Sequence, residues 1–148
     1  MKIALIFGVN GQDGSYLAEF LLKKNYVVHG TRRYSSTGSL DNIKNVLTKK
    51  NFYLHFSDIT DSSNIHNLIS KCNPDEVYNL AAQSHVHVSF FTPEHTSDVD
   101  ALGHLRVIEA CRKINKKIKI YNASTSELFG STKVRPQNEK TPFEPVSP

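Results

Sequence analysis

Near its start, the chain has a turn in which glycine recurs at every third position. Residues 2–8 are apolar and predict a buried strand before the turn, and residues 14–24 have the apolar spacing of a helix and end in lysines. A glycine-rich turn lets the backbone approach a pyrophosphate closely, and the helix amino terminus offers it free N–H groups. The alternative is a tight turn without a ligand. We expect a dinucleotide to bind here, at Gly8, Val9, Asn10, Gly11, Gln12, Asp13 and Gly14.

Short apolar runs and longer amphipathic segments alternate along most of the 148 residues. Strands are predicted at residues 2–8, 26–31, 51–57, 76–80 and 117–122, and helices at residues 14–24, 40–49, 98–113 and from residue 61. This alternation predicts an α/β fold with a doubly wound parallel sheet, the NAD(P)-binding Rossmann fold, in strand order 3-2-1-4-5. We assign residues 1–130 to this domain. Residues 131–148, which hold four of the six prolines, are predicted to be a loop.

The second predicted strand ends in two arginines, Arg32 and Arg33, with no acidic residue before Asp41. An acid at this place bonds the ribose 2′-hydroxyl of NAD, whereas an arginine accommodates the 2′-phosphate of NADP. A guanidinium suits a phosphate because its planar fork can donate two hydrogen bonds at once. The sequence therefore favours NADP, and the alternative is a pair of solvated surface arginines.

The third and fourth predicted strands end in residues that suit a flat cofactor. Asp58 could accept a hydrogen bond from the adenine amino group; a helix cap is the open alternative, although Asp61 is already placed as one. Small residues after the fourth strand would let a cofactor pass over the carboxyl edge, where open α/β sheets bind ligands. We expect these cofactor contacts at Leu80, Ala81, Ala82, Gln83 and Ser84.

A further motif, ASTSELFG at residues 123–130, follows the fifth predicted strand. With the glycine turn and NLAAQSHV at residues 79–86, it resembles the extended short-chain dehydrogenase/reductase family. The stretches GVNGQDGSYLAEFLL, TRRYSS, DITDSSN and PDEVYNLAAQSHV are similar to those of its GDP-mannose 4,6-dehydratase branch. The resemblance covers nearly every residue of the chain.

The resemblance implies an NADP-dependent lyase of GDP-mannose. In the family, hydride passes from C4 of the mannose to NADP⁺, a base removes the C5 proton, water leaves from C6, and the hydride returns to C6. The product, GDP-4-keto-6-deoxy-mannose, is a precursor of fucose and related sugars. The threonine matching Thr125 bonds the 4-hydroxyl, and the glutamate matching Glu127 handles the C5 proton. A carboxylate at a strand's carboxyl end is placed for general-base work; a surface glutamate is the alternative.

The family pattern also implies cofactor contacts at Tyr34, Ile59 and His95. His95 stands where the family commonly has a tyrosine, which puts that contact in doubt. The family's Tyr-x-x-x-Lys pair does not occur in this sequence, so we expect a fragment that lacks the substrate domain and is inactive alone. The intact enzyme is expected to be a homo-oligomer, a tetramer, in which residues 31–36 reach toward a neighbouring subunit's cofactor.

Two other classes of function remain open on the sequence. One is a sibling sugar-nucleotide dehydratase or epimerase, although epimerases leave C6 alone and generally lack a glutamate at the position of Glu127. The other is a non-catalytic NADP-binding module.

Composition argues against several other partners. The formal net charge is +4, and the lysines at 116, 117 and 119 lack interleaved aromatics, which favours a solvated loop over a nucleic-acid surface. No apolar run is long enough to span a membrane. Cys72 and Cys111 have no CxxC spacing and indicate reduced thiols, so we expect a cytoplasmic protein. His85 and His87 would share one face of a strand, but no third ligand is in view, and we expect no metal site.

Overall fold

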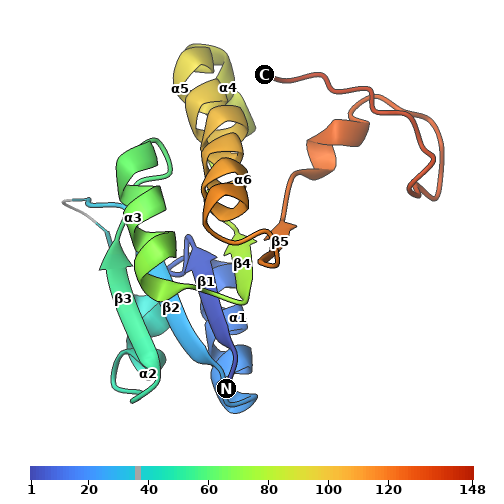
Figure 1. Ribbon diagram of the computed structural model, residues 1–148. Helices are drawn as coiled ribbons and strands as arrows, with labels where there is room; N and C mark the ends of the chain where they lie inside the picture. The colour runs from blue at the N-terminus through green and yellow to red at the C-terminus, as the bar shows by residue number, and fades with distance from the viewer. Residues whose placement is uncertain (36–37) are drawn as a thin grey trace.

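The computed structural model describes residues 1–35 and 38–148, which form a parallel sheet with helices on both faces (Figure 1). The strands among these residues are β1 (Ile3–Phe7), β2 (Val27–Arg32), β3 (Phe52–Phe56), β4 (Glu76–Asn79) and β5 (Lys119–Asn122). They are hydrogen-bonded in the order β3-β2-β1-β4-β5, and each adjacent pair is parallel. The predicted doubly wound α/β fold and its strand order are therefore confirmed.

Helices cover the sheet on each side. Those in the described part of the chain are α1 (Gln12–Lys23), α2 (Lys44–Leu47), α3 (Ser62–Cys72), α4 (Val86–Phe91), α5 (Pro93–Ser97) and α6 (Gly103–Ile114), with 3-10 turns η1 (Asp41–Ile43) and η3 (Ser126–Phe129) and a π-helical turn η2 (Asp98–Leu102). Helices α1 and α2 pack on one face, and α3 and α6 pack on the other.

The central strand β1 separates two hydrophobic cores. Ala4 and Ile6 pack toward α1, whereas Leu5 and Phe7 pack toward α3 and α6, and all four are at most 1% exposed. Burial on both faces explains why this strand is a continuous apolar run in the sequence rather than an alternating one. Cys72 of α3 and Cys111 of α6 are free thiols that are buried in the core on the face that these two helices cover.

The segment between β4 and α6 differs from the prediction. Residues 86–97 form α4 and α5, where no helix is predicted, because their buried residues, Ser89 and Thr96, are polar and leave no apolar periodicity. The predicted helix over residues 98–113 begins instead with the π-helical turn η2. His85 and His87 are the cap and second residue of α4, so the suggestion that they share one face of a strand is wrong.

The last part of the chain leaves the sheet after β5 and extends beside it (Figure 1). Residues 131–148 contain turns and irregular backbone, without a helix or strand. Within residues 1–35 and 38–148, no helix has the length and apolar character needed to cross a membrane.

Candidate functional site

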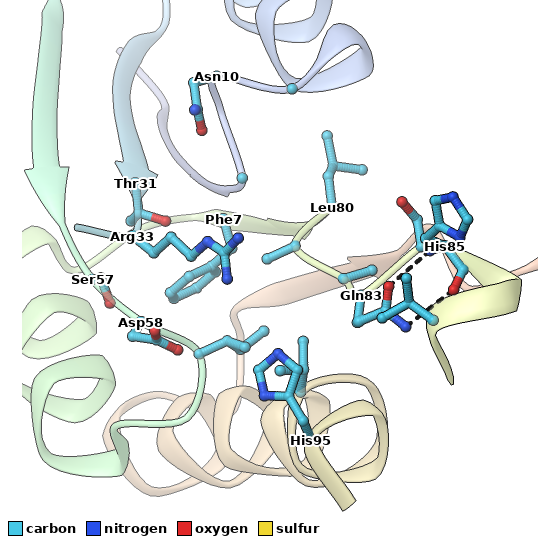
Figure 2. Close-up of a pocket in the computed structure, with 18 of the residues that line it drawn as sticks. Phe7, Asn10, Thr31, Arg33, Ser57, Asp58, Leu80, Gln83, His85 and His95 are labelled. Carbon is cyan, nitrogen blue, oxygen red and sulfur yellow. Dashed lines mark hydrogen bonds between the residues drawn. The ribbon is translucent and has the colours of Figure 1, made fainter. Parts of the chain in front are cut away.

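A cleft of about 650 Å³ opens at the carboxyl ends of β1 and β4, between the strand ends and helices α4 and α5 (Figure 2). The chain crosses from one half of the sheet to the other at this point, which is where doubly wound sheets bind ligands. The predicted cofactor residues that line the cleft are Gly8, Asn10, Gly11, Arg33, Asp58, Ile59, Leu80, Ala81, Ala82, Gln83, Ser84 and His95.

The glycine turn forms one wall of the cleft and is packed too closely for side chains. Gly8 has a φ of +80°, and a Cβ on it would lie 3.0 Å from the amide nitrogen of Ala81. A Cβ on Gly14 would collide with the carbonyl oxygen of Gly8. The turn therefore brings bare backbone to the amino terminus of α1. Gln12 and Asp13 are exposed in the first turn of that helix, Gly14 is buried, and none of the three lines the cleft.

Val9 has a structural position within the same turn. Its side chain is fully buried, and its amide donates to the carbonyl oxygen of Thr31 at 3.0 Å. A Cβ on Gly30 would lie 2.6 Å from Cγ1 of Val9. The side chain of Val9 thus fills the space over β2 and anchors the turn, and only its backbone can serve a ligand.

The two arginines after β2 point to different places. Arg33 lines the cleft, and Figure 2 shows its guanidinium extending into the cleft beside Phe7. Arg32 instead lies over the ring of Phe56, 5.0 Å from its centroid, and its Nη1 donates to the carbonyl oxygen of Gly38 at 3.1 Å. Tyr34, which is 84% exposed, also packs against Phe56. Neither Arg32 nor Tyr34 lines the cleft.

Asp58 is held as an anion opposite Arg33. Oδ1 of Asp58 accepts two hydrogen bonds from Thr60, one from the backbone amide at 3.0 Å and one from the side-chain hydroxyl at 2.8 Å. Partial burial alone would raise the pKa of the Asp58 carboxyl, but these bonds and the nearby Arg33 and His95 outweigh burial and lower that pKa. The cap of α3 is Asp61, which accepts from the amide of Asn64 at 2.9 Å. Asp58 is therefore not that cap.

The floor of the cleft is fixed by hydrogen bonds from Gln83. Its backbone N–H donates to Oδ1 of Asp100 at 2.8 Å. Its side-chain Nε2 donates to Oγ1 of Thr96 and to the carbonyl oxygen of His85, each at 3.2 Å. Figure 2 shows the bonds between Gln83 and His85. These contacts join the loop after β4 to α5 and η2, and so close the cleft on the side of His95.

Several lining residues lie outside the predicted set: Phe7, Thr31, Ser57, His85, Val88, Thr92 and Val99. Thr31 and Ser57 come from the ends of β2 and β3, where the parallel-sheet prediction could have found them. His85, Val88 and Thr92 belong to the segment that forms α4 and α5, which left no apolar signal in the sequence, whereas Val99 lies in the predicted helix over residues 98–113.

The predicted catalytic residues lie at the same edge of the sheet, one strand further along. The amide of Ala123 donates to the carbonyl oxygen of Asn79 at 3.1 Å, which places the start of the motif beside the end of β4. Thr125 then caps η3, and its Oγ1 accepts from the amide of Glu127 at 3.1 Å. Thr125 is exposed and Glu127 is half-buried, and neither lines the cleft.

A parallel sheet in this strand order, with a glycine-rich turn at the point where the order reverses, defines a dinucleotide-binding domain of the Rossmann class. Comparison with known families gives the branch. The sequence profile described as GDP-mannose 4,6 dehydratase matches residues 5–148, and the chain belongs to this family.

Individual relatives agree with this assignment. The chain is 54% identical over 154 residues to a GDP-mannose 4,6-dehydratase of Vibrio cholerae serotype O1. The aligned stretch covers 99% of this chain and 41% of that relative. Among solved structures, the UDP-Glc/GlcNAc 4-epimerase of Campylobacter jejuni superposes with a TM-score of 0.89 at 22% identity, over 99% of this chain and 44% of that one. The Bordetella bronchiseptica enzyme WbmH, in complex with NAD⁺, gives a TM-score of 0.82 at 26% identity, over 99% and 47%.

Proposed function

We propose that this chain is the cofactor-binding part of an NADP-dependent GDP-mannose 4,6-dehydratase, a hydro-lyase that forms GDP-4-keto-6-deoxy-mannose. The family and the name of its Vibrio relative support this reaction. Because the chain spans 41% of that relative, the activity is proposed for the whole protein. The observation that carries the cofactor assignment is the cleft, which places Arg33 across from Asp58 beside a bare glycine turn.

The residues of the cleft fit nicotinamide adenine dinucleotide phosphate (NADP). The solved relative WbmH is in complex with NAD⁺, which supports a cofactor of this class. The turn at Gly8 has no room for a Cβ and therefore presents bare backbone. A bound pyrophosphate can approach such a backbone closely. Arg33 would hold the 2′-phosphate, Asp58 would accept from the adenine amino group, and the backbone of residues 80–84 would lie along the nicotinamide half. His95 would contact the adenosine half from α5.

The chemistry at the sugar would belong to residues after β5. When bound, NADP⁺ supplies a hydride acceptor that later returns the hydride to C6. The hydroxyl of Thr125 would bond the 4-hydroxyl of the mannose and hold C4 toward the cleft. The carboxylate of Glu127 would take the C5 proton and pass it to the departing C6 hydroxyl, which leaves as water. Thr125 is exposed at the sheet edge and Glu127 is half-buried there, so a substrate could reach both side chains.

The proposal is tested by incubating the full-length protein with GDP-mannose and NADP⁺ and following the nucleotide sugar by mass spectrometry. A dehydratase gives a product lighter by one water. A sugar of unchanged mass but altered configuration would indicate an epimerase, and no turnover with tight NADP binding would indicate a binding module. Either of those outcomes rejects the dehydratase assignment.

We also propose a cytoplasmic homo-tetramer for the whole protein. The buried free thiols Cys72 and Cys111 support a reducing compartment. Residues 31–35 support a subunit contact, because Tyr34 is highly exposed beside the cleft-lining Arg33; Ser36 of the predicted contact loop lies outside the described residues. Light scattering of the full-length protein tests this, and a monomer would refute it.

A further inference from the structure

Two histidines and a cysteine meet on the face of the sheet that α3 covers. His29 lies in β2, His55 lies in the edge strand β3, and Cys72 is the last residue of α3. Nδ1 of His29 lies 2.9 Å from Nε2 of His55, and these two nitrogens and Sγ of Cys72 all lie within 4.8 Å of one another. None of the three lines the cofactor cleft. The prediction that the chain holds no metal rests on His85 and His87, which are not part of this cluster.

We propose that His29, His55 and Cys72 form a binding site for a divalent transition-metal ion of the Zn²⁺ type. Two imidazole nitrogens and one thiolate are a donor set that Zn²⁺ accepts, with a water molecule in the fourth tetrahedral position. Hard ions such as Mg²⁺ and Ca²⁺ prefer oxygen donors and do not match this set.

The donors need only small movements to bind an ion. Zinc bonds of about 2.0–2.1 Å to nitrogen and about 2.3 Å to sulfur place tetrahedral ligands about 3.3 Å apart for two nitrogens and about 3.6 Å apart for nitrogen and sulfur. The two nitrogens would separate by about 0.4 Å from their present 2.9 Å. Sγ of Cys72 would approach by at most about 1.2 Å from the 4.8 Å limit. Side-chain rotations of this size require no change in the strands.

The protons of the site also balance. Burial, with smaller contributions from His55 and Lys71, lowers the pKa of His29 to about 4. Burial, with a smaller contribution from Lys71, also lowers the pKa of His55, so both imidazoles can be neutral at neutral pH. One of the two facing nitrogens holds the proton of their hydrogen bond, and on binding that proton moves to the same ring's other nitrogen. Burial raises the pKa of Cys72 to about 11, so its thiol is protonated before binding. Binding one ion then forms one metal–sulfur bond and releases one proton to solvent.

Such an ion would join three separate elements. It would connect β2 to the edge strand β3 and would fix the carboxyl end of α3 to both. An edge strand has neighbours on one side only, so an added link there restrains the part of the sheet most able to detach. The alternative is a metal-free hydrogen bond between two histidines beside a core cysteine.

Cobalt provides the direct test, because a thiolate bound to Co²⁺ gives a charge-transfer band in the near ultraviolet. The full-length protein, made without a histidine tag and stripped with EDTA, is titrated with Co²⁺ and then with competing Zn²⁺. We expect a band at one equivalent that Zn²⁺ removes, and a band that is absent in Cys72→Ser. Cys111→Ser is the matched control, since Cys111 is also a buried free thiol of the same core cluster, and it keeps the band.

The histidines are tested in the same way. His55→Gln weakens Co²⁺ binding at least tenfold, whereas His66→Gln, at an exposed histidine on α3, leaves it unchanged. Circular dichroism checks the fold, and if Cys72→Ser does not fold, His55→Gln decides. Absence of a thiolate band in the native protein, persistence of that band in folded Cys72→Ser, or unchanged binding by folded His55→Gln overturns the proposal. Because no cofactor or substrate is involved, these outcomes are independent of the dehydratase assignment.

Discussion

Nδ2 of Asn79 donates to Oδ1 of Asn122 at 3.2 Å and so joins the ends of β4 and β5 at the edge where the cleft opens. The same Nδ2 lies 3.3 Å from Nδ1 of His104, and Oδ1 of Asn79 accepts from the amide of Ala81 at 3.3 Å. One buried side chain therefore connects a cleft residue, the start of α6 and the strand that leads to Thr125.

His104 makes this junction sensitive to acid. Burial lowers the pKa of its imidazole, and its Nδ1 must be unprotonated to accept from Asn79. In the unfolded chain the imidazole takes up a proton below about pH 6.5. The unfolded state then binds more protons, so the free energy of unfolding decreases as the pH falls below that value. We expect His104→Gln to lessen this decrease, as measured by urea unfolding at about pH 7 and about pH 5.5. His66→Gln is the exposed control, and equal decreases in native protein and His104→Gln would contradict the assignment.

Arg33, and not Arg32, is expected to determine the preference for NADP. A hydrogen bond to a charged group contributes about 1.5–3 kcal/mol, so Arg33→Ala should weaken NADP binding by roughly 10- to 100-fold. NAD binding should change little, because NAD has no 2′-phosphate. Arg32→Ala is the matched control, since its guanidinium is engaged with Phe56 and Gly38. Calorimetric titration of the native protein and both variants with each cofactor checks this, and an equal loss for both cofactors in Arg33→Ala would show the role to be wrong.

Gly14 is expected to tolerate no side chain. A methyl group there would meet the carbonyl oxygen of Gly8 and the backbone of Val9, neither of which can move without displacing the turn. Forcing atoms into packed regions typically costs about 1–3 kcal/mol, so Gly14→Ala should lower the free energy of unfolding by about that amount. Gly11→Ala is the milder comparison, because the added Cβ would lie 3.3 Å from the oxygen of Gly8. Urea denaturation measures both variants, and the expectation fails if Gly14→Ala is as stable as the native protein.

Glu127 is expected to serve the elimination more than the oxidation at C4. Glu127→Gln keeps the size of the side chain but removes the proton acceptor, and loss of a general base typically costs 10²–10⁴-fold in rate. In the full-length enzyme, product formation should fall by this factor while a transient absorbance of NADPH still develops. Glu139→Gln, at an exposed glutamate in residues 131–148, is the control. Normal turnover by Glu127→Gln would leave that residue without a catalytic role.

Much of the fold was predictable from the sequence because the signals were local. The central strand β1 is an apolar run, and the glycine turn and the alternation of elements indicate the sheet order. Helices α4 and α5 were not predictable, because Ser89 and Thr96 occupy their buried positions and periodicity depends on apolar residues.

The candidate site was predictable to a lesser extent. The strand ends that face the cleft follow from parallel pairing, so Arg33, Asp58 and residues 80–84 could be named in advance. The different directions of Arg32 and Arg33 depend on the stacking of Arg32 on Phe56, a contact between residues far apart in sequence. The meeting of His29, His55 and Cys72 is likewise a consequence of tertiary structure, which no spacing in the sequence encodes.

The contact between Val9 and Gly30 has a consequence for how this sequence can change. Each residue occupies the space that a larger partner would need, so substitutions at the two positions are not independent. Alanine at position 30 alone would push the turn away from β2, whereas the same alanine beside a smaller residue at position 9 could be accommodated. The two positions are therefore expected to vary together among functional descendants, and a double-mutant cycle on Val9 and Gly30 should show strong positive epistasis.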